Sequence, residues 1–193
     1  MPEAGDIVPL IRGLSDASSE KRGAAAAALF EKGSEAIDPI LRAWLAFAAL
    51  SDLIKRAGSG KPRLTVGIAV QPGTFDGIRA ANGSPRLAKV PPDQDACEFE
   101  LDFPGAVHLD ILTTRDASGA GAIAKYLQKF GEGIQQVEIS VRNVDRATEI
   151  LRSQFALQPI YPVTRAGADG TRVNFFLAST PDGKKVLIEL VEV

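Results

Sequence analysis

The sequence has few of the residue types that mark several classes of protein. It contains one cysteine, one histidine, one methionine and one tryptophan in 193 residues. A single cysteine, Cys97, excludes an intrachain disulfide and a cysteine-rich zinc site. The formal net charge of −2 provides no basic field that would attract phosphates, so neither nucleic acid nor an anionic membrane is an expected partner.

Long apolar runs are also missing. The most apolar stretch, AWLAFAAL at 43–50, is far shorter than the roughly 20 residues that span a bilayer. The start, MPEAGDIVPLIRG, has no basic segment followed by an apolar core, which argues against a signal peptide. Hydrophobic residues make up 45% of the chain and charged residues 24%, an ordinary globular composition. We therefore expect a cytoplasmic globular protein.

The first 58 residues predict three helices. Apolar residues recur at helical spacing over 6–14, from Ser18 or Ser19 to Lys32, and from Ser34 to about Arg56. Gly33 suits the position just after a helix end. The segments LIRGLSD and KRGAAAAAL, with the restart G-x-x-A-I-x-P-I-L, resemble a HEAT-type helical repeat. Because solenoids need about three such units, the pattern favours a helical cap over a peptide-binding solenoid.

The pattern changes after the turn signal at 57–62. From Arg63 onward the chain alternates apolar and polar residues with a period of two, which predicts strands, interrupted by helical patterns near 123–130 and 144–151. The stretch Gln71–Val90 is rich in glycine and proline, and only 75–81 has a short helical pattern. These features predict an α+β domain over 63–193, preceded by a helical segment over 1–58.

Two pairs of segments in this domain match each other in the same order. TVGIAV at 65–70 matches QVEISV at 136–141, and VHLDIL at 107–112 matches VLIELV at 186–191. The match makes Thr65 correspond to Gln136, and Asp110 to Glu189. We interpret it as a duplicated βαβββ unit, with modules at about 63–114 and 134–193, in which the first module has a degenerate helix.

The run IAKYLQKFGEGIQQVEISV, followed by Asn-Val-Asp at 143–145, and the ending DGKKVLIELVEV are similar to methylmalonyl-CoA epimerase. More broadly they resemble the vicinal oxygen chelate superfamily, which includes glyoxalase I and bleomycin-resistance proteins. The resemblance covers roughly Arg63–Val193. It implies a half-closed sheet of two βαβββ modules around a cavity, paired within one chain or exchanged with a second chain in a homodimer. Metal-dependent members place one ligand on the first and one on the last strand of each module.

Residue matching to this family gives four candidate metal ligands: Thr65, Asp110, Gln136 and Glu189. The family usually has histidines at the first-strand positions, where this chain has Thr65 and Gln136. Loss of both imidazoles removes the nitrogen donors that favour zinc. The remaining oxygen donors suit magnesium, manganese or a similar divalent ion.

Three functions stay open at this point. The first is a metal-dependent isomerase or lyase acting on small 2-oxo or thioester compounds, with Glu138 or His108 as the catalytic base, because each lies two residues from a candidate ligand on the same strand face. The second is a metal-free, non-catalytic module that binds a small molecule, which a hydrogen bond between Gln136 and Glu189 would favour. The third is a protein-interaction module, which a cavity plugged by the N-terminal helices would favour. An ordinary strand histidine bonded to a neighbour is the alternative for His108.

Overall fold

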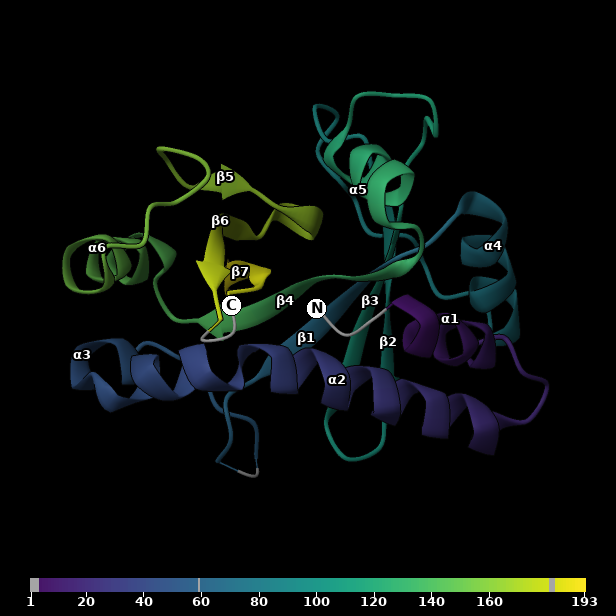
Figure 1. Cartoon of the computed structure of the whole chain (residues 1–193), viewed down its shortest axis with the longest axis horizontal. Helices are drawn as coiled ribbons and strands as arrows, with labels where there is room; N and C mark the ends of the chain where they lie inside the picture. The colour runs from purple at the N-terminus through teal and green to yellow at the C-terminus, as the bar shows by residue number, and fades with distance from the viewer. Residues whose placement is uncertain (1–3, 59, 181–182) are drawn as a thin grey trace.

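The structure is a computed structural model that describes residues 4–58, 60–180 and 183–193. Ser59 of the predicted linker and Asp182 of the DGKK motif lie outside the described residues. Figure 1 shows one curled sheet with α1 and α2 side by side along it. The helices are α1 (Ala4–Gly13), α2 (Ser19–Ala46), α3 (Ala48–Ser51), α4 (Pro72–Ala81), α5 (Ala122–Phe130), α6 (Val144–Phe155) and the 3-10 turn η1 (Ala168–Gly170). The strands are β1 (Leu64–Ala69), β2 (Cys97–Phe103), β3 (Val107–Thr113), β4 (Gly133–Val141), β5 (Arg165–Ala166), β6 (Arg172–Ser179) and β7 (Lys185–Glu192).

The N-terminal segment differs from its prediction at Gly33. Helix α2 runs through this residue without a break for 28 residues, so the predicted helix end at Gly33 is wrong. Gly33 is buried against β1, and a Cβ atom at this position would lie 2.6 Å from Cγ2 of Val66. The glycine therefore lets the helix approach the sheet closely. Glycine is common both just after a helix end and at such close contacts, so the residue type alone does not distinguish the two. Ser18 is the N-cap, and its hydroxyl accepts a hydrogen bond from the backbone of Lys21.

The sheet has the strand order β2-β3-β1-β4-β7-β6-β5. Strand β1 is parallel to β3, β4 is parallel to β7, and β1 meets β4 in an antiparallel pair at the centre. Gly67 is level with Asp110, and Glu138 is level with Glu189. This register agrees with the internal match, which makes Gly67 correspond to Glu138 and Asp110 to Glu189.

The two halves of the sheet differ in their strands. The helix of the first half was expected to be degenerate, but α4 forms ten residues with Pro72 at its first turn, so that expectation is wrong. Two strands, β2 and β3, follow α4, whereas three strands, β5 to β7, follow α6. The first half therefore lacks a strand, not a helix.

One face of the sheet carries the apolar core. Val66, Ile68, Phe99 and Ile111 pack with α1, α2 and α4, and Val137, Ile139 and Ile188 pack with α2 and α6. Each fully buried aliphatic or aromatic side chain stabilises the fold by about 1.5–3 kcal/mol. Helix α5 lies on the opposite face, where Ile123 and Leu127 contact Leu112. The two faces of the sheet are therefore unequally covered.

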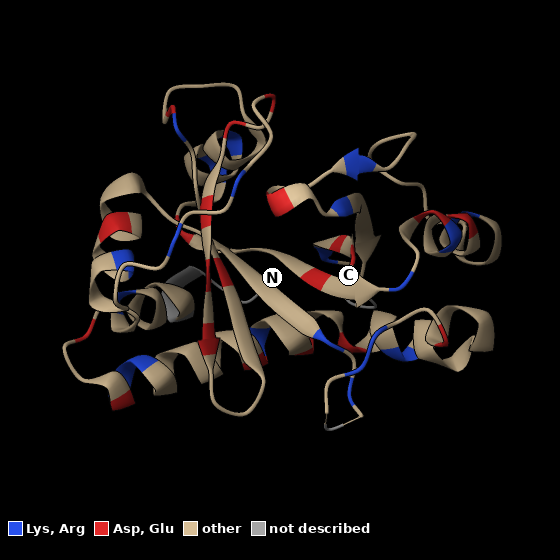
Figure 2. Cartoon of the chain, turned by 180° about the vertical axis from the view of Figure 1, so that it is seen from behind, with Lys and Arg blue, Asp and Glu red and all other residues tan. Residues whose placement is uncertain are grey.

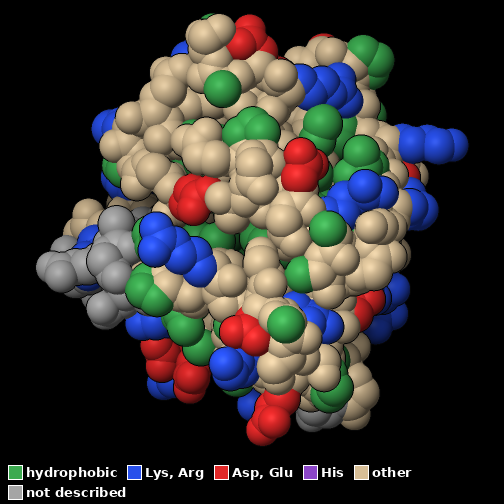
Figure 3. All heavy atoms as spheres, turned by 90° about the vertical axis from the view of Figure 1, so that its right-hand side faces the viewer, with side chains coloured by type: hydrophobic (Ala, Val, Ile, Leu, Met, Phe, Trp, Pro, Cys, Tyr) green, Lys and Arg blue, Asp and Glu red, His purple; other side chains and the backbone are tan. Residues whose placement is uncertain are grey.

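The exterior shows no continuous field of one charge on the face that Figure 3 presents, where Lys and Arg side chains lie among Asp and Glu. None of the helices in the described residues is long and apolar enough to cross a membrane.

Candidate functional site

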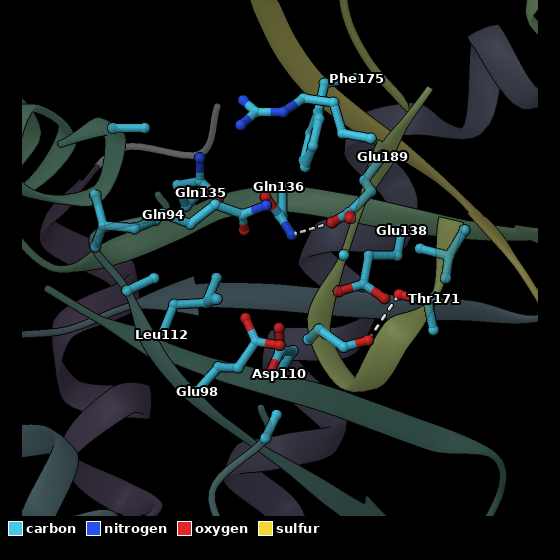
Figure 4. A pocket seen from close by; sticks show the side chains of 18 of the residues that line it. Gln94, Glu98, Asp110, Leu112, Gln135, Gln136, Glu138, Thr171, Phe175 and Glu189 are labelled. Carbon is cyan, nitrogen blue, oxygen red and sulfur yellow. Dashed lines mark hydrogen bonds between the residues drawn. The ribbon is translucent and has the colours of Figure 1, made fainter. Parts of the chain in front are cut away.

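The face of the sheet opposite α2 encloses a cavity of about 550 Å³. Because successive strand residues point to opposite faces, the polar positions of β2, β3, β4 and β7 project into it while their apolar neighbours enter the core. Its floor is formed by Glu98, Asp110, Gln136, Glu138 and Glu189. Figure 4 shows the carboxyl groups of Glu98 and Asp110 together, with Glu138 opposite them and Gln136 beside Glu189. The N-terminal helices pack on the other face and do not fill the cavity.

A β-bulge brings two consecutive glutamines to this cavity. In the pairing of β1 with β4, Gly67 opposes Gln136 and Ile68 opposes Ile134, so Gln135 is the extra residue. A bulge re-aims the side chain of the inserted residue. Simple alternation places Gln135 on the core face beside Val137, but Gln135 lines the cavity with Gln136. The sequence alone gave no signal for this, because a bulge depends on the partner strand.

The side chain of Gln136 occupies the centre of the floor. Its Nε2 donates a hydrogen bond to Oε2 of Glu189 at 2.5 Å, and both residues are buried. On β1, the residue facing it is Gly67, where a Cβ atom would lie 2.6 Å from Cγ of Gln136. The space above β1 is therefore filled by Gln136, and β1 contributes no side chain at this level.

The carboxyl groups of the floor hold their protons more strongly than usual. Burial, with repulsion from Glu98 and Glu100, raises the pKa of Glu138 to about 8. Burial, with repulsion from Glu100 and Asp169, raises the pKa of Glu98 to about 7. The pKa values of Asp110 and Glu189 are raised well above the ordinary range, again mainly by burial.

Acidic residues also dominate the cavity as a whole. Among the described residues that line it are eight with carboxyl groups and a single arginine, Arg165. In Figure 2 acidic residues recur along the strands of the sheet. Arg165 forms an ion pair with Asp93 and stacks over the ring of Tyr161, with 4.4 Å between its guanidinium carbon and the ring centroid. The one cation of the lining is therefore already paired.

Two ion pairs hold the cavity mouth. Arg86 pairs with Asp169 at 2.7 Å, and Arg165 pairs with Asp93, so the chain before β2 is joined twice to the segment from β5 to η1. The backbone of Lys89 also donates a hydrogen bond to Asp169 at 3.0 Å. The guanidinium of Arg86 lowers the pKa of Asp169 to about 2, so this pair stays charged at neutral pH.

The structure brings most of the predicted site residues together, but not all. Asp110, Gln136, Glu138 and Glu189 line the cavity, whereas Thr65 and His108 do not. Thr65 pairs with Glu138 on the neighbouring strand, two residues along the strand from the pair that Gly67 forms with Gln136. His108 bonds through Nδ1 to Asp102 at 2.6 Å, which is the ordinary strand histidine of the alternative interpretation.

Sequence reasoning missed three residues of the site. They are Glu98, Glu100 and Gln135. The two glutamates alternate with Cys97, Phe99 and Leu101, which pack toward the helices. That alternation could have placed the glutamates on the cavity face.

The predicted ligand set does not fit a divalent metal ion as it stands. Glu189 accepts a hydrogen bond from the amide of Gln136, and the position on β1 that faces them is Gly67, which has no side chain. Within the described part of the chain, no three His, Cys, Asp or Glu side chains are grouped so that they could hold a metal. We therefore do not treat these residues as the ligands of a metal ion.

Comparison of the whole chain with known proteins identifies similar folds. No family model matches the chain, and no curated protein does. Among solved structures, the methylmalonyl-CoA epimerase from Mycobacterium tuberculosis is 34% identical over 66% of this chain and 85% of its own, with a TM-score of 0.53. A hypothetical protein from Bacillus halodurans is 27% identical over 67% of this chain and 91% of its own, with a TM-score of 0.54.

A third solved structure is a methylmalonyl-CoA epimerase in complex with methylmalonyl-CoA and NH4+. It is 25% identical over 66% of this chain and 91% of its own, with a TM-score of 0.51. All three cover most of their own length with the same curled sheet. By sequence identity and by fold, the chain belongs to the methylmalonyl-CoA epimerase-like group of the vicinal oxygen chelate family.

Proposed function

We propose that this chain binds a small thioester or 2-oxo compound in the cavity, without a metal ion. The observation that carries the proposal is the hydrogen bond from Gln136 to Glu189 at the floor of an open cavity of about 550 Å³. This bond uses the carboxylate that the family resemblance would assign to a metal. The epimerase complex with methylmalonyl-CoA supports a thioester as the ligand class.

The floor offers hydrogen-bond donors to a carbonyl oxygen. A carbonyl accepts hydrogen bonds, and a protonated carboxyl group can donate one. Because the pKa of Glu138 is raised to about 8, this group carries a proton at neutral pH. Asp110 lies next to it and has a pKa well above the usual range. The site can therefore polarise a carbonyl with its own acids.

Calorimetric titration with propionyl-CoA and with 2-oxobutyrate, in the presence of EDTA, tests this function. We expect saturable binding of at least one compound, weakened about tenfold or more in Glu138→Leu, which loses the donor. Glu138→Gln keeps an N–H donor and should bind within about threefold of the unsubstituted protein. Asp102→Asn, on the same sheet but outside the cavity, is the control. Binding that appears only after a divalent metal is added would contradict the proposal.

Metal-independent proton exchange is a second candidate, favoured by Glu138. A group whose pKa is about 8 can both take and return a proton near neutral pH, as a catalytic base must. Mass spectrometry of propionyl-CoA incubated with the protein in D2O and EDTA would detect deuterium at the carbon next to the thioester. We expect Glu138→Gln to abolish this exchange while retaining binding. Exchange that persists in Glu138→Gln would remove the residue from this role.

A further inference from the structure

Two buried acceptor atoms in the cavity lack a donor. Asp110 is 5% exposed and Gln135 is 9% exposed, and both line the cavity. Oδ1 of Asp110 and Oε1 of Gln135 have no hydrogen-bond partner. Buried acceptors in native structures are nearly always paired, and an unpaired one costs free energy. The amide oxygen of Gln135 accepts and cannot donate, so its missing partner is a donor.

The charge of the cavity points to a cation. Eight of the described residues that line the cavity carry carboxyl groups. The lining also includes one arginine, Arg165, which is paired with Asp93. A ligand that brings positive charge would favour the ionised form of Asp110 and would form strong charge-assisted hydrogen bonds with it. A ligand that brings a carboxylate, as methylmalonyl-CoA does, would fit only while these groups keep their protons.

Apolar side chains form the walls above this acidic floor. They are Leu112, Ile123, Phe175 and Leu187. Such walls suit the methylene groups of a short aliphatic chain, whose burial is favourable. A primary ammonium carries three N–H donors on one small group, enough for both unpaired acceptors and one further carboxylate.

We propose that the cavity takes a primary ammonium group at the end of a short acyl chain, so that its ligand is an aminoacyl thioester. The ammonium would donate to Oδ1 of Asp110 and to Oε1 of Gln135, and the aliphatic chain would lie between Leu112 and Phe175. This inference rests on the proposed function, because the thioester part of the ligand comes from there. It adds a selectivity opposite in charge to that of the epimerases.

Four coenzyme A thioesters test the charge and the N–H donors. They are 3-aminopropionyl-CoA, its neutral isostere butyryl-CoA, the anionic methylmalonyl-CoA, and 3-(trimethylammonio)propionyl-CoA, which has the positive charge but no N–H. Calorimetry in EDTA should show 3-aminopropionyl-CoA binding at least about tenfold tighter than each of the others. Equal binding of the amino and butyryl compounds would overturn the inference, and equal binding of the trimethylammonio compound would overturn its donor geometry.

Variants assign the selectivity to the two acceptors. Asp110→Asn should reduce the preference for the amino compound over butyryl-CoA to about threefold or less, while Asp102→Asn should leave it unchanged. Gln135→Glu adds a negative charge at the second acceptor and should increase the preference, which keeps the test informative if Asp110→Asn does not fold. A preference unaffected by both cavity variants would overturn the assignment.

The outcomes also separate this inference from the proposed function. If butyryl-CoA binds and the amino compound binds no tighter, the inference fails and the proposed function stands. If none of the thioesters binds but propylammonium does, the ammonium site stands and the thioester class fails. If neither the thioesters nor propylammonium binds, both fail.

Discussion

Raising the pH from about 5 to about 8 should destabilise this protein. Four carboxyl groups of the cavity floor have a pKa above the ordinary value in the folded state: Glu98, Asp110, Glu138 and Glu189. A raised folded-state pKa means that the folded chain keeps protons that the unfolded chain releases. The stability that these protons contribute is fully present below about pH 4.5 and is lost as the pH rises through the folded-state pKa.

Glu138 sets the scale of the effect. Its pKa rises from 4.5 in the unfolded chain to about 8 in the folded protein. At about pH 5 the folded state keeps the proton and the unfolded state holds it about a quarter of the time, whereas at about pH 8 the unfolded state has lost it and the folded state keeps it about half of the time. Linkage then gives a loss of about 3 kcal/mol in the free energy of unfolding from this group. A typical domain is stable by only about 5–15 kcal/mol, so the effect is large enough to measure.

Urea unfolding followed by the fluorescence of Trp44, the single tryptophan and a buried residue of α2, measures this dependence. Titrations at several pH values between about 5 and 8 should show a falling free energy of unfolding. Glu138→Gln cannot ionise and should have a shallower slope, whereas Glu149→Gln, on the exposed face of α6, should keep the original slope. A flat or rising stability over this range, or an unchanged slope in Glu138→Gln, would refute the reasoning.

Two glycine substitutions test how closely the elements pack. Gly33→Ala should lower the stability by about 1–3 kcal/mol, because its Cβ would lie 2.6 Å from Val66. Gly23→Ala in the same helix has 4.0 Å to its nearest neighbour and should raise the stability by about 0.5–1 kcal/mol, so thermal melts of the two variants should shift in opposite directions. Gly67→Ala should displace Gln136, because Cγ of Gln136 would be 2.6 Å from the new Cβ. We expect the free energy of ligand binding to fall by more than the free energy of unfolding. Equal binding by Gly67→Ala and the unsubstituted protein would show that this position of Gln136 is not required.

Local sequence patterns determined the elements and their faces. The alternation along 134–141 put Val137 and Ile139 in the core and Gln136 and Glu138 in the cavity, because successive strand residues point to opposite sides. The match between the two halves also made Asp110 correspond to Glu189, and the structure places the two at equivalent positions in the two parallel strand pairs. These features follow from the chain itself, so they could be read before any partner strand was known.

Only the tertiary structure decided how separate segments meet. A glycine such as Gly33 can mark either a helix end or a close contact between a helix and a strand. The proximity of Gly33 to Val66 shows that the second applies here. Gln135 lines the cavity because the pairing of β1 with β4 contains a bulge. His108 is bonded to Asp102 and does not line the cavity. The raised pKa values arise because acids from four strands share one buried floor. Contacts between distant residues depend on register and burial, and no single segment of the sequence encodes either.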